Sequence, residues 1–263
     1  MTVGNSLDIA ITPEDAAGPQ PGRWPFWRTL GWGLVVMTVS TLVQSLAIVA
    51  AGAIDLVRLH RTFGSLTSFY QLLAGDAASG DVLVTTVIVS DLACVAAILL
   101  IVAFKRLPAR DYLAAYRVRV PVLLKWAGVL FVYVMLTSGA ATLFHIDFGG
   151  AVMGDILTDS DRPWLFWIAV VVAAPLFEEV FFRGFLFRGF EASFLKVPGT
   201  VVLTAILWAA LHIQYNAYGI AFIAGAGILF GLARARTGSL LVPLALHAGM
   251  NLAETVAMTV YGA

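Results

Sequence analysis

Long apolar blocks, separated by shorter polar segments, fill most of the chain. Seven of them stand out, at about 28–53, 82–104, 121–144, 163–182, 199–213, 217–233 and 239–261. About 20 mostly apolar residues suffice for a helix to cross the hydrocarbon core of a bilayer. The pattern therefore predicts an all-α fold, a polytopic transmembrane helical bundle of about seven spans. The block at 199–213 is the shortest, and the odd number of spans depends on it.

The composition also indicates a membrane protein. Apolar residues make up 60% of the chain and charged residues only 12%, whereas soluble domains are about 45–50% apolar and about 25% charged. The formal net charge is zero and there is no dense basic run, so nothing indicates nucleic-acid binding. The single cysteine, Cys94, lies within an apolar block, so disulfide and redox chemistry are not expected.

The segments that flank the first block have a different character. Residues 1–22 are rich in Pro, Gly, Ala and acidic residues, and we interpret them as a disordered cytoplasmic tail rather than a cleaved secretory signal. Trp24 and Trp27 are typical of an anchor at the membrane interface. The stretch 54–80 has a rough helical period and is a candidate for a helix that lies in the interface.

The density of basic residues alternates from one connecting segment to the next. The three basic segments carry Lys105, Arg106, Arg110, Arg117 and Arg119 after the second block, Arg188 and Lys196 after the fourth, and Arg234 and Arg236 after the sixth. The segment 145–162 instead contains four aspartates. Because Lys and Arg accumulate on the cytoplasmic side of a membrane, we expect the N-terminus and the basic segments in the cytoplasm and the C-terminus outside.

Three groups of polar residues interrupt the last apolar blocks, where an ionisable side chain costs about 2.5–3.5 kcal/mol. In the first group, Glu179 and Arg183 are four residues apart and face each other on a helix. Glu178 is turned about 100° away, which leaves it available as a base. Taken alone, this group is explained equally well by an ion-pair cluster where the helix leaves the bilayer.

The second and third groups each contain a histidine. Trp208 and His212 are four residues apart, so the indole can pack beneath the imidazole and orient it. His247 and Asn251 share one helix face in the same way, with small residues between them. Packing alone could explain any one group, but it is a poor explanation for all three together.

Other unusual residues within the blocks have simpler interpretations. Asp91 is expected to form an interhelical hydrogen bond, and Gln44 to join neighbouring helices. Gly227 and Gly231 form a small-xxx-small pair, which favours close helix packing. Glu254, one turn beyond the third polar group, is a candidate for the lining of the same cavity.

These residues resemble the three motifs of the CAAX protease and bacteriocin-processing family, which includes the type II CAAX prenyl endopeptidases. The order and the separations of the motifs are also similar, over roughly 163–255. The matching positions are Glu178-Glu179-x-x-x-Arg183, Trp208-x-x-x-His212 and His247-x-x-x-Asn251. Tryptophan stands where phenylalanine is usual in the second motif, and either ring can pack against the histidine. Spans 1–3 carry no motif of this family.

The resemblance implies a helical intramembrane protease with a conical cavity. In the implied roles, Glu178 and His212 activate water, and His247 and Asn251 stabilise the oxyanion. The supporting residues are Glu179 and Arg183, which position the first carboxylate or the substrate, and Trp208. The chain is accordingly divided into the tail 1–22, transmembrane helices 1–3 with their loops at 23–162, and the catalytic helices 4–7 at 163–263.

Two mechanisms are compatible with this set of residues. Peptide hydrolysis needs a base for water, donors for the oxyanion and an acid for the leaving amine, and no cofactor is required if the side chains supply them. A zinc site formed by His212, His247 and Glu178 or Glu179 is the alternative. The H-E-x-x-H arrangement is absent, and Asn251 suits an oxyanion better than zinc. The metal-free mechanism is favoured, and the zinc-dependent mechanism stays an open alternative.

The sequence therefore predicts an intramembrane endopeptidase that acts on a membrane-tethered protein or peptide, which in the CAAX case is prenylated. Membrane lipids and this substrate are the expected partners, and the cytoplasmic membrane of a prokaryote is the expected location. We expect the cavity to open toward the cytoplasm. Two alternatives stay open: a non-catalytic scaffold or bacteriocin-immunity protein with the same fold, and an ion- or proton-coupled transporter. The sequence does not indicate an oligomeric state.

The predicted boundaries create one geometric difficulty. A fourth span that ends at residue 182 puts Glu178 near the cytoplasmic surface, whereas His212 lies about 20 Å from that surface at 1.5 Å per residue. The two side chains can meet only if the segment 183–198 dips into the membrane or if the fourth span extends beyond 182.

Overall fold

The computed structural model describes residues 24–58, 79–149 and 151–261, together with three single positions between the first two ranges. Within these residues every regular element is a helix, and the one β-type pairing is an isolated bridge between Gly149 and Tyr215. The all-α prediction is confirmed. The predicted tail 1–22 lies outside the described residues, as does most of the candidate interface helix at 54–80.

Six helices are long and apolar enough to cross a membrane in the part of the chain that the structure describes. Five of these are α1 (Phe26–Arg58), α3 (Gly80–Phe104), α5 (Val120–Leu143), α11 (Ala217–Thr237) and α12 (Leu241–Tyr261). The sixth is a composite helix, Pro163–Phe190. The shortest predicted span corresponds to α10 (Lys196–Ala210), which has only 15 residues. Short helices α4 (Ala109–Tyr112) and α6 (Ala151–Thr158) lie in connecting segments. The predicted polytopic bundle is confirmed, with α10 as its short member.

The composite helix changes its winding along its length. Its parts are α7 (Pro163–Trp167), η2 (Ile168–Ala173), α8 (Ala174–Glu179), η3 (Val180–Leu186) and α9 (Phe187–Phe190), and both η segments are π-helical. Pro175 lies just after η2 and has no N–H to donate to an earlier carbonyl, which disturbs regular α-helical bonding there. Segments of π-helix are frequent at functional sites.

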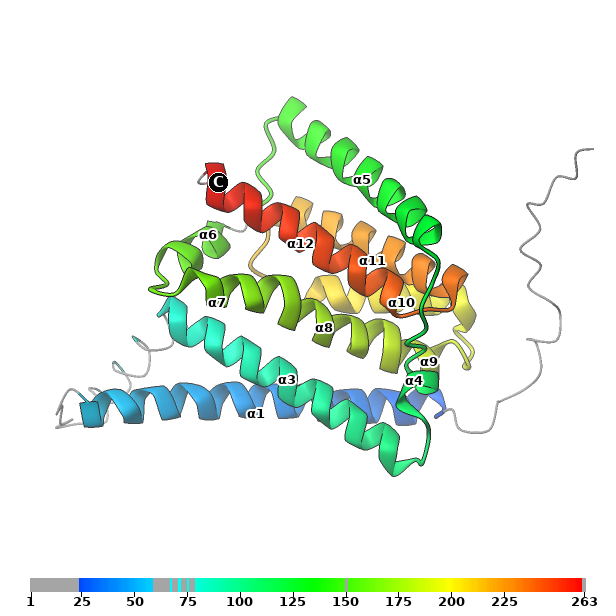
Figure 1. Cartoon of the computed structure of the whole chain (residues 1–263), viewed down its shortest axis with the longest axis horizontal. Helices are drawn as coiled ribbons and strands as arrows, with labels where there is room; N and C mark the ends of the chain where they lie inside the picture. Colours follow the sequence, from blue (N-terminus) through cyan, green and yellow to red (C-terminus); the bar gives the residue numbers. More distant parts are fainter. Residues whose placement is uncertain are drawn as a thin grey trace, which may run out of the picture.

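Figure 1 shows how the helices are arranged in space. α1 and α3 pack side by side along one edge of the bundle, the composite helix lies next to α3, and α5 lies on the opposite edge against α11 and α12. α10 packs on α11. A side chain at Gly227 would meet Trp208, and one at Gly231 would meet Val201. The predicted close packing of this small-xxx-small pair is confirmed.

The outer surface of the bundle is apolar. Leu46 on α1, Leu100 on α3 and Leu136 on α5 are each 67–69% exposed. Apolar side chains exposed in this way are more favourable in contact with lipid than with water. The interior instead contains a buried cluster rich in aromatic residues, among them Phe181, Phe185, Phe190, Trp208 and Phe230. The chain is an integral, multi-pass membrane protein.

The composite helix resolves the geometric difficulty in the sequence. It ends at Phe190, so the boundary predicted near residue 182 was wrong. Glu178 lies in the middle of this helix, about 18 Å before its end at 1.5 Å per residue. His212 follows the end of α10, and both side chains line one cavity. The longer fourth span, rather than a dip of 183–198 into the membrane, brings them to a common depth.

Candidate active site

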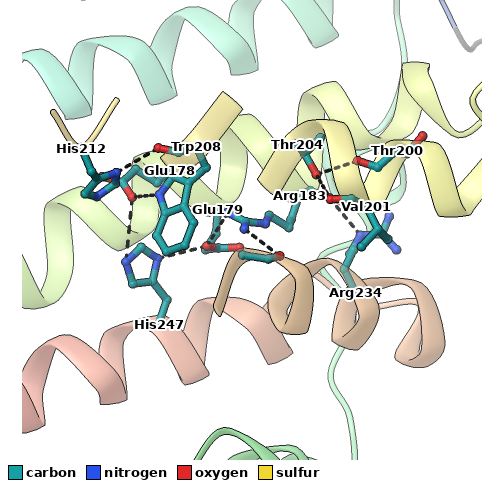
Figure 2. A network of polar contacts seen from close by, with 11 residues as sticks. Glu178, Glu179, Arg183, Thr200, Val201, Thr204, Trp208, His212, Arg234 and His247 are labelled. Atoms are coloured by element: carbon teal, nitrogen blue, oxygen red, sulfur yellow. Dashed lines mark hydrogen bonds and ion pairs between the residues drawn. The ribbon is translucent and has the colours of Figure 1, made fainter. Parts of the chain in front are cut away.

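Glu178 lies where three helices meet. The indole Nε1 of Trp208, on α10, donates a hydrogen bond to Glu178 Oε2, on α8 (Figure 2). His247 Nε2, on α12, lies 3.8 Å from the same oxygen. The Glu178 side chain is 19% exposed and faces a cavity. The prediction that Glu178 points away from the neighbouring ion pair is confirmed, and its availability as a base stays a prediction.

Glu179 and Arg183 form a buried ion pair behind Glu178. Arg183 Nη1 lies 3.1 Å from Glu179 Oε1, and neither side chain is exposed, as the four-residue spacing predicted. The same oxygen lies 3.0 Å from His247 Nδ1. An ionised carboxylate only accepts hydrogen bonds, so Nδ1 is the donor in this contact. The imidazole of His247 is thereby oriented with Nε2 toward Glu178.

The Arg183 guanidinium is enclosed by protein. Its Nη2 donates to the carbonyl of Gly227 over 3.1 Å, and its central carbon lies 4.7 Å from the Trp208 ring centroid and 5.6 Å from that of Phe230. A buried charge is costly unless it is paired and hydrogen-bonded. Because Arg183 does not line the cavity, these contacts favour the first of its two predicted roles, the positioning of the carboxylates.

His212 lies just beyond the C-terminal end of α10. Its Nδ1 is 2.9 Å from the backbone carbonyl of Trp208, and the two rings meet edge to face with centroids 5.2 Å apart. The predicted packing of Trp208 against His212 is confirmed. Since a carbonyl only accepts, Nδ1 carries a hydrogen, and Nε2 is left as the basic atom of the neutral ring.

Asn251 is anchored by the first π-helical segment. Its Nδ2 donates to the carbonyl of Val170 over 2.8 Å. In this segment the N–H of Ala174 bonds to the carbonyl of Ala169, five residues earlier. By the same pattern Pro175 would bond to Val170, but proline has no N–H. The Val170 carbonyl can therefore accept from Asn251, which joins α12 to η2.

One cavity of about 610 Å³ connects these side chains. The predicted site residues that line it are Glu178, Trp208, His212, His247 and Asn251. Glu179 and Arg183 lie behind this surface and support it. Glu254 also lines the cavity, as the sequence suggested. Ligand pockets commonly have volumes of about 300–1,000 Å³, so the space is sufficient for a short peptide segment.

Among the lining residues that sequence reasoning missed are Asp147 and Tyr215, because both lie in connecting segments outside the motifs. The ring centroid of Tyr215 is 6.2 Å from that of His212. Burial, with a further contribution from the carboxylates of Glu254 and Glu178, raises the pKa of Tyr215. Its hydroxyl therefore keeps its proton. The one sequence signal for this residue was its position three residues after His212.

Gln44 and Asp91 do not line the cavity. Gln44 Nε2, on α1, donates to Ser90 Oγ on α3 over 3.3 Å, so its prediction as a link between helices is confirmed. Asp91 follows Ser90 on α3 and is buried. The interhelical hydrogen bond expected for Asp91 stays a prediction.

The described residues contain no group of three or more His, Cys, Asp or Glu side chains arranged to hold a metal ion. His247 Nδ1 is directed at Glu179, and His212 Nδ1 at a backbone carbonyl. Both contacts leave Nε2 of each ring available, an arrangement that zinc-bound histidines share, so the zinc alternative stays open.

Comparison with protein families confirms the resemblance seen in the motifs. The family described as type II CAAX prenyl endopeptidase, Rce1-like, matches residues 160–253. These residues are similar to that family. The Rce1-like segment agrees closely with the similarity expected over 163–255, and it contains all three motifs.

Comparison with individual proteins adds one relative. A protein of Escherichia coli, described as an uncharacterized 24.3 kDa protein, is 31% identical over 134 residues, which are 49% of this chain and 60% of the relative. The chain therefore spans 60% of the length of the curated relative it matches. No solved structure matches the chain.

Proposed function

We propose that the chain is an intramembrane endopeptidase that hydrolyses a peptide bond of a membrane-tethered protein with water activated by Glu178. The observation that carries the proposal is the convergence of Glu178, His212, His247 and Asn251 on one cavity. They come from two helices, α8 and α12, and from the segment that follows α10. The Rce1-like match supports the same activity.

Glu178 is the base in the proposed reaction. The hydrogen bond from Trp208 occupies Oε2, so Oε1 can take a proton from a water molecule in the cavity. His212 Nε2 accepts a hydrogen bond from the other hydrogen of the same water. The water oxygen then bonds to the carbonyl carbon of the substrate, and the carbonyl oxygen becomes negatively charged. Both acceptors lie in a largely apolar bundle, where such interactions are stronger than in water.

His247 and Asn251 stabilise the oxyanion. When its ring is doubly protonated, His247 donates from Nδ1 to Glu179 and from Nε2 toward the developing charge. An amide nitrogen carries two hydrogens, so Asn251 can keep its bond to Val170 and donate the second one. Donors that are positioned before the reaction contribute most to the rate, and the buried pair of Glu179 and Arg183 supplies that positioning.

Collapse of the tetrahedral intermediate breaks the C–N bond and releases an amine that needs a proton. The proton that Glu178 took from water reaches the leaving nitrogen through His212 Nε2. The second product is a carboxylic acid, and Glu178 returns to its ionised form. No cofactor takes part in this scheme.

The proposal assigns catalysis to the helices of 163–263 and a supporting role to 23–162. Val84 on α3 and Phe148 after α5 contribute to the cavity wall, so the N-terminal helices help to enclose the substrate. The Escherichia coli relative supports a location in a prokaryotic cytoplasmic membrane.

The proposal is tested by comparing protein termini in the membranes of cells that express the wild type, Glu178→Gln or Glu191→Gln. Glu191 is a matched control, because this carboxylate pairs with Arg188 at 3.1 Å and does not line the cavity. New N-termini are expected with the wild type and Glu191→Gln, and not with Glu178→Gln at equal protein level. Identical termini in all three strains would contradict the assigned role of Glu178. A cellular phenotype that persists in Glu178→Gln would favour the non-catalytic alternative.

A further inference from the structure

The cavity occupies only one half of the bundle. Its wall on α3 comes from the first turns of that helix, Leu83, Val84 and Val87. Its wall on α12 runs from His247 to Met258, near the end of that helix. Asp147 and Tyr215, in connecting segments at the same end, complete it. In Figure 1 this is the end where α6, the start of α7 and the C-terminus lie. The cavity therefore extends from Glu178 toward this end.

The opposite half of the bundle is filled with side chains. Phe185, Phe187 and Phe190, in the last part of the composite helix, are completely buried. Arg234 Nε on α11 donates to the carbonyl of Arg183 over 3.0 Å, and this bond links α11 to the composite helix. A peptide that approached Glu178 from this half would have to separate these contacts.

The two ends of the bundle differ in charge. The filled end carries the basic residues of helix ends and of the segments beside them: Lys105, Arg106, Arg110, Arg117, Arg119, Arg188, Lys196, Arg234 and Arg236. The segment 145–162 at the cavity end has four aspartates and Arg162. Since Lys and Arg gather on the cytoplasmic side, the filled end faces the cytoplasm and the cavity faces the other side. This geometry does not support the cytoplasmic opening expected from the sequence.

We infer that the substrate is a membrane-tethered peptide segment that enters the cavity from the extracytoplasmic side of the membrane. The inference rests on the proposed function and names the substrate class of the same site. That class consists of segments next to the membrane on its outer face rather than cytoplasmic C-termini.

The charge of the cavity wall narrows the class further. Asp147, Glu178 and Glu254 line it, and no Lys or Arg is among the described lining residues. A cleft of one charge with low-dielectric walls attracts ligands of the opposite charge. The bound segment therefore carries a basic side chain near the scissile bond, and a free C-terminal carboxylate is disfavoured.

Cysteine labelling tests the side of access without any need for activity. In a Cys94→Ala background, one cysteine is placed in the cavity wall (Ala257→Cys), one at its mouth (Ala151→Cys) and one in the basic last turn of α11 (Arg236→Cys). A sulfonated, membrane-impermeant maleimide is added to intact spheroplasts and to inverted vesicles. Ala257→Cys and Ala151→Cys are expected to react at least about tenfold more in spheroplasts, and Arg236→Cys at least about tenfold more in inverted vesicles.

Labelling of Ala257→Cys mainly from the cytoplasmic side, or from neither side, would overturn the inference. The termini found in the comparison of wild type and Glu178→Gln provide a second test. They should map to extracytoplasmic segments with nearby Lys or Arg. If they map to cytoplasmic tails, the proposed function stands and the side of access is wrong. If no Glu178-dependent termini exist while the labelling holds, the proposed function fails by itself.

Discussion

At the scale of single residues, Trp208 connects the parts of the site. Its indole donates to Glu178, its ring lies against Arg183 and His247, and its carbonyl faces His212. The sequence predicted only the contact with His212, because neighbours four residues apart can be read from a single helix. Contacts between helices depend on how the helices pack, and the spacing of residues along one helix does not contain that information.

Trp208→Phe is expected to lower kcat/KM about 10- to 100-fold with little change in the thermal unfolding midpoint. Phenylalanine keeps an aromatic ring against Arg183 but cannot donate to Glu178, and a hydrogen bond to a charged group contributes about 1.5–3 kcal/mol. Trp126→Phe makes the same exchange on α5, away from the cavity, and should behave as the wild type. Equal kinetics for the two variants would show that the indole N–H does not position Glu178.

Removal of the Arg183 charge is expected to destabilise the protein by about 3–5 kcal/mol, because it leaves the Glu179 carboxylate buried beside its remaining partners. Arg183→Met should therefore unfold at a much lower temperature in detergent. The double variant Arg183→Met/Glu179→Gln should recover part of the stability and none of the activity, since His247 loses its ionised acceptor. Arg188→Met, which breaks a pair with partly exposed side chains, should cost about 1 kcal/mol or less. A similar loss in both single variants would contradict the assigned role of the buried pair.

At the scale of helices, the apolar blocks predicted where most spans lie, but not how the fourth one continues. The pair of Glu179 and Arg183 resembled a boundary, because charged side chains are costly inside a membrane. The pairing of Arg183 with Glu179 and its contact with the Gly227 carbonyl bury Arg183 completely, so the helix runs on to Phe190. The two π-helical segments were also not predicted. They shift residues away from the 3.6-residue repeat on which the sequence argument relied.

Pro175→Ala tests whether the irregular winding serves the site. Alanine restores an N–H that can bond to the Val170 carbonyl, so Asn251 should share this acceptor and be held less firmly. We expect kcat to fall several-fold while the stability of the protein is unchanged or higher, since a helix-interior proline is unfavourable. Pro163→Ala, at the first helical position where proline is tolerated, is the control and should leave kcat unchanged. An unaltered kcat in Pro175→Ala would show that the π-helical segment η2 is not needed for catalysis.

At the scale of the whole molecule, the alternation of basic and acidic segments predicted the membrane orientation, and the three motifs predicted which residues would line one cavity. Both came from features that are local in the sequence. The half of the bundle in which the cavity lies could not be predicted, since it depends on where the phenylalanines of the composite helix pack. Asp147 and Tyr215 became visible only once the connecting segments were placed around the cavity.

The central claim is that Glu178 activates water for peptide hydrolysis inside this cavity. Its most direct test is the turnover of a peptide, taken from a segment cleaved in cells, by purified wild-type protein and by Glu178→Gln in the same detergent. General-base catalysis contributes about 10²- to 10⁴-fold, so kcat should fall by about that factor in Glu178→Gln at an unchanged unfolding midpoint. Turnover by Glu178→Gln at the wild-type rate would contradict the claim.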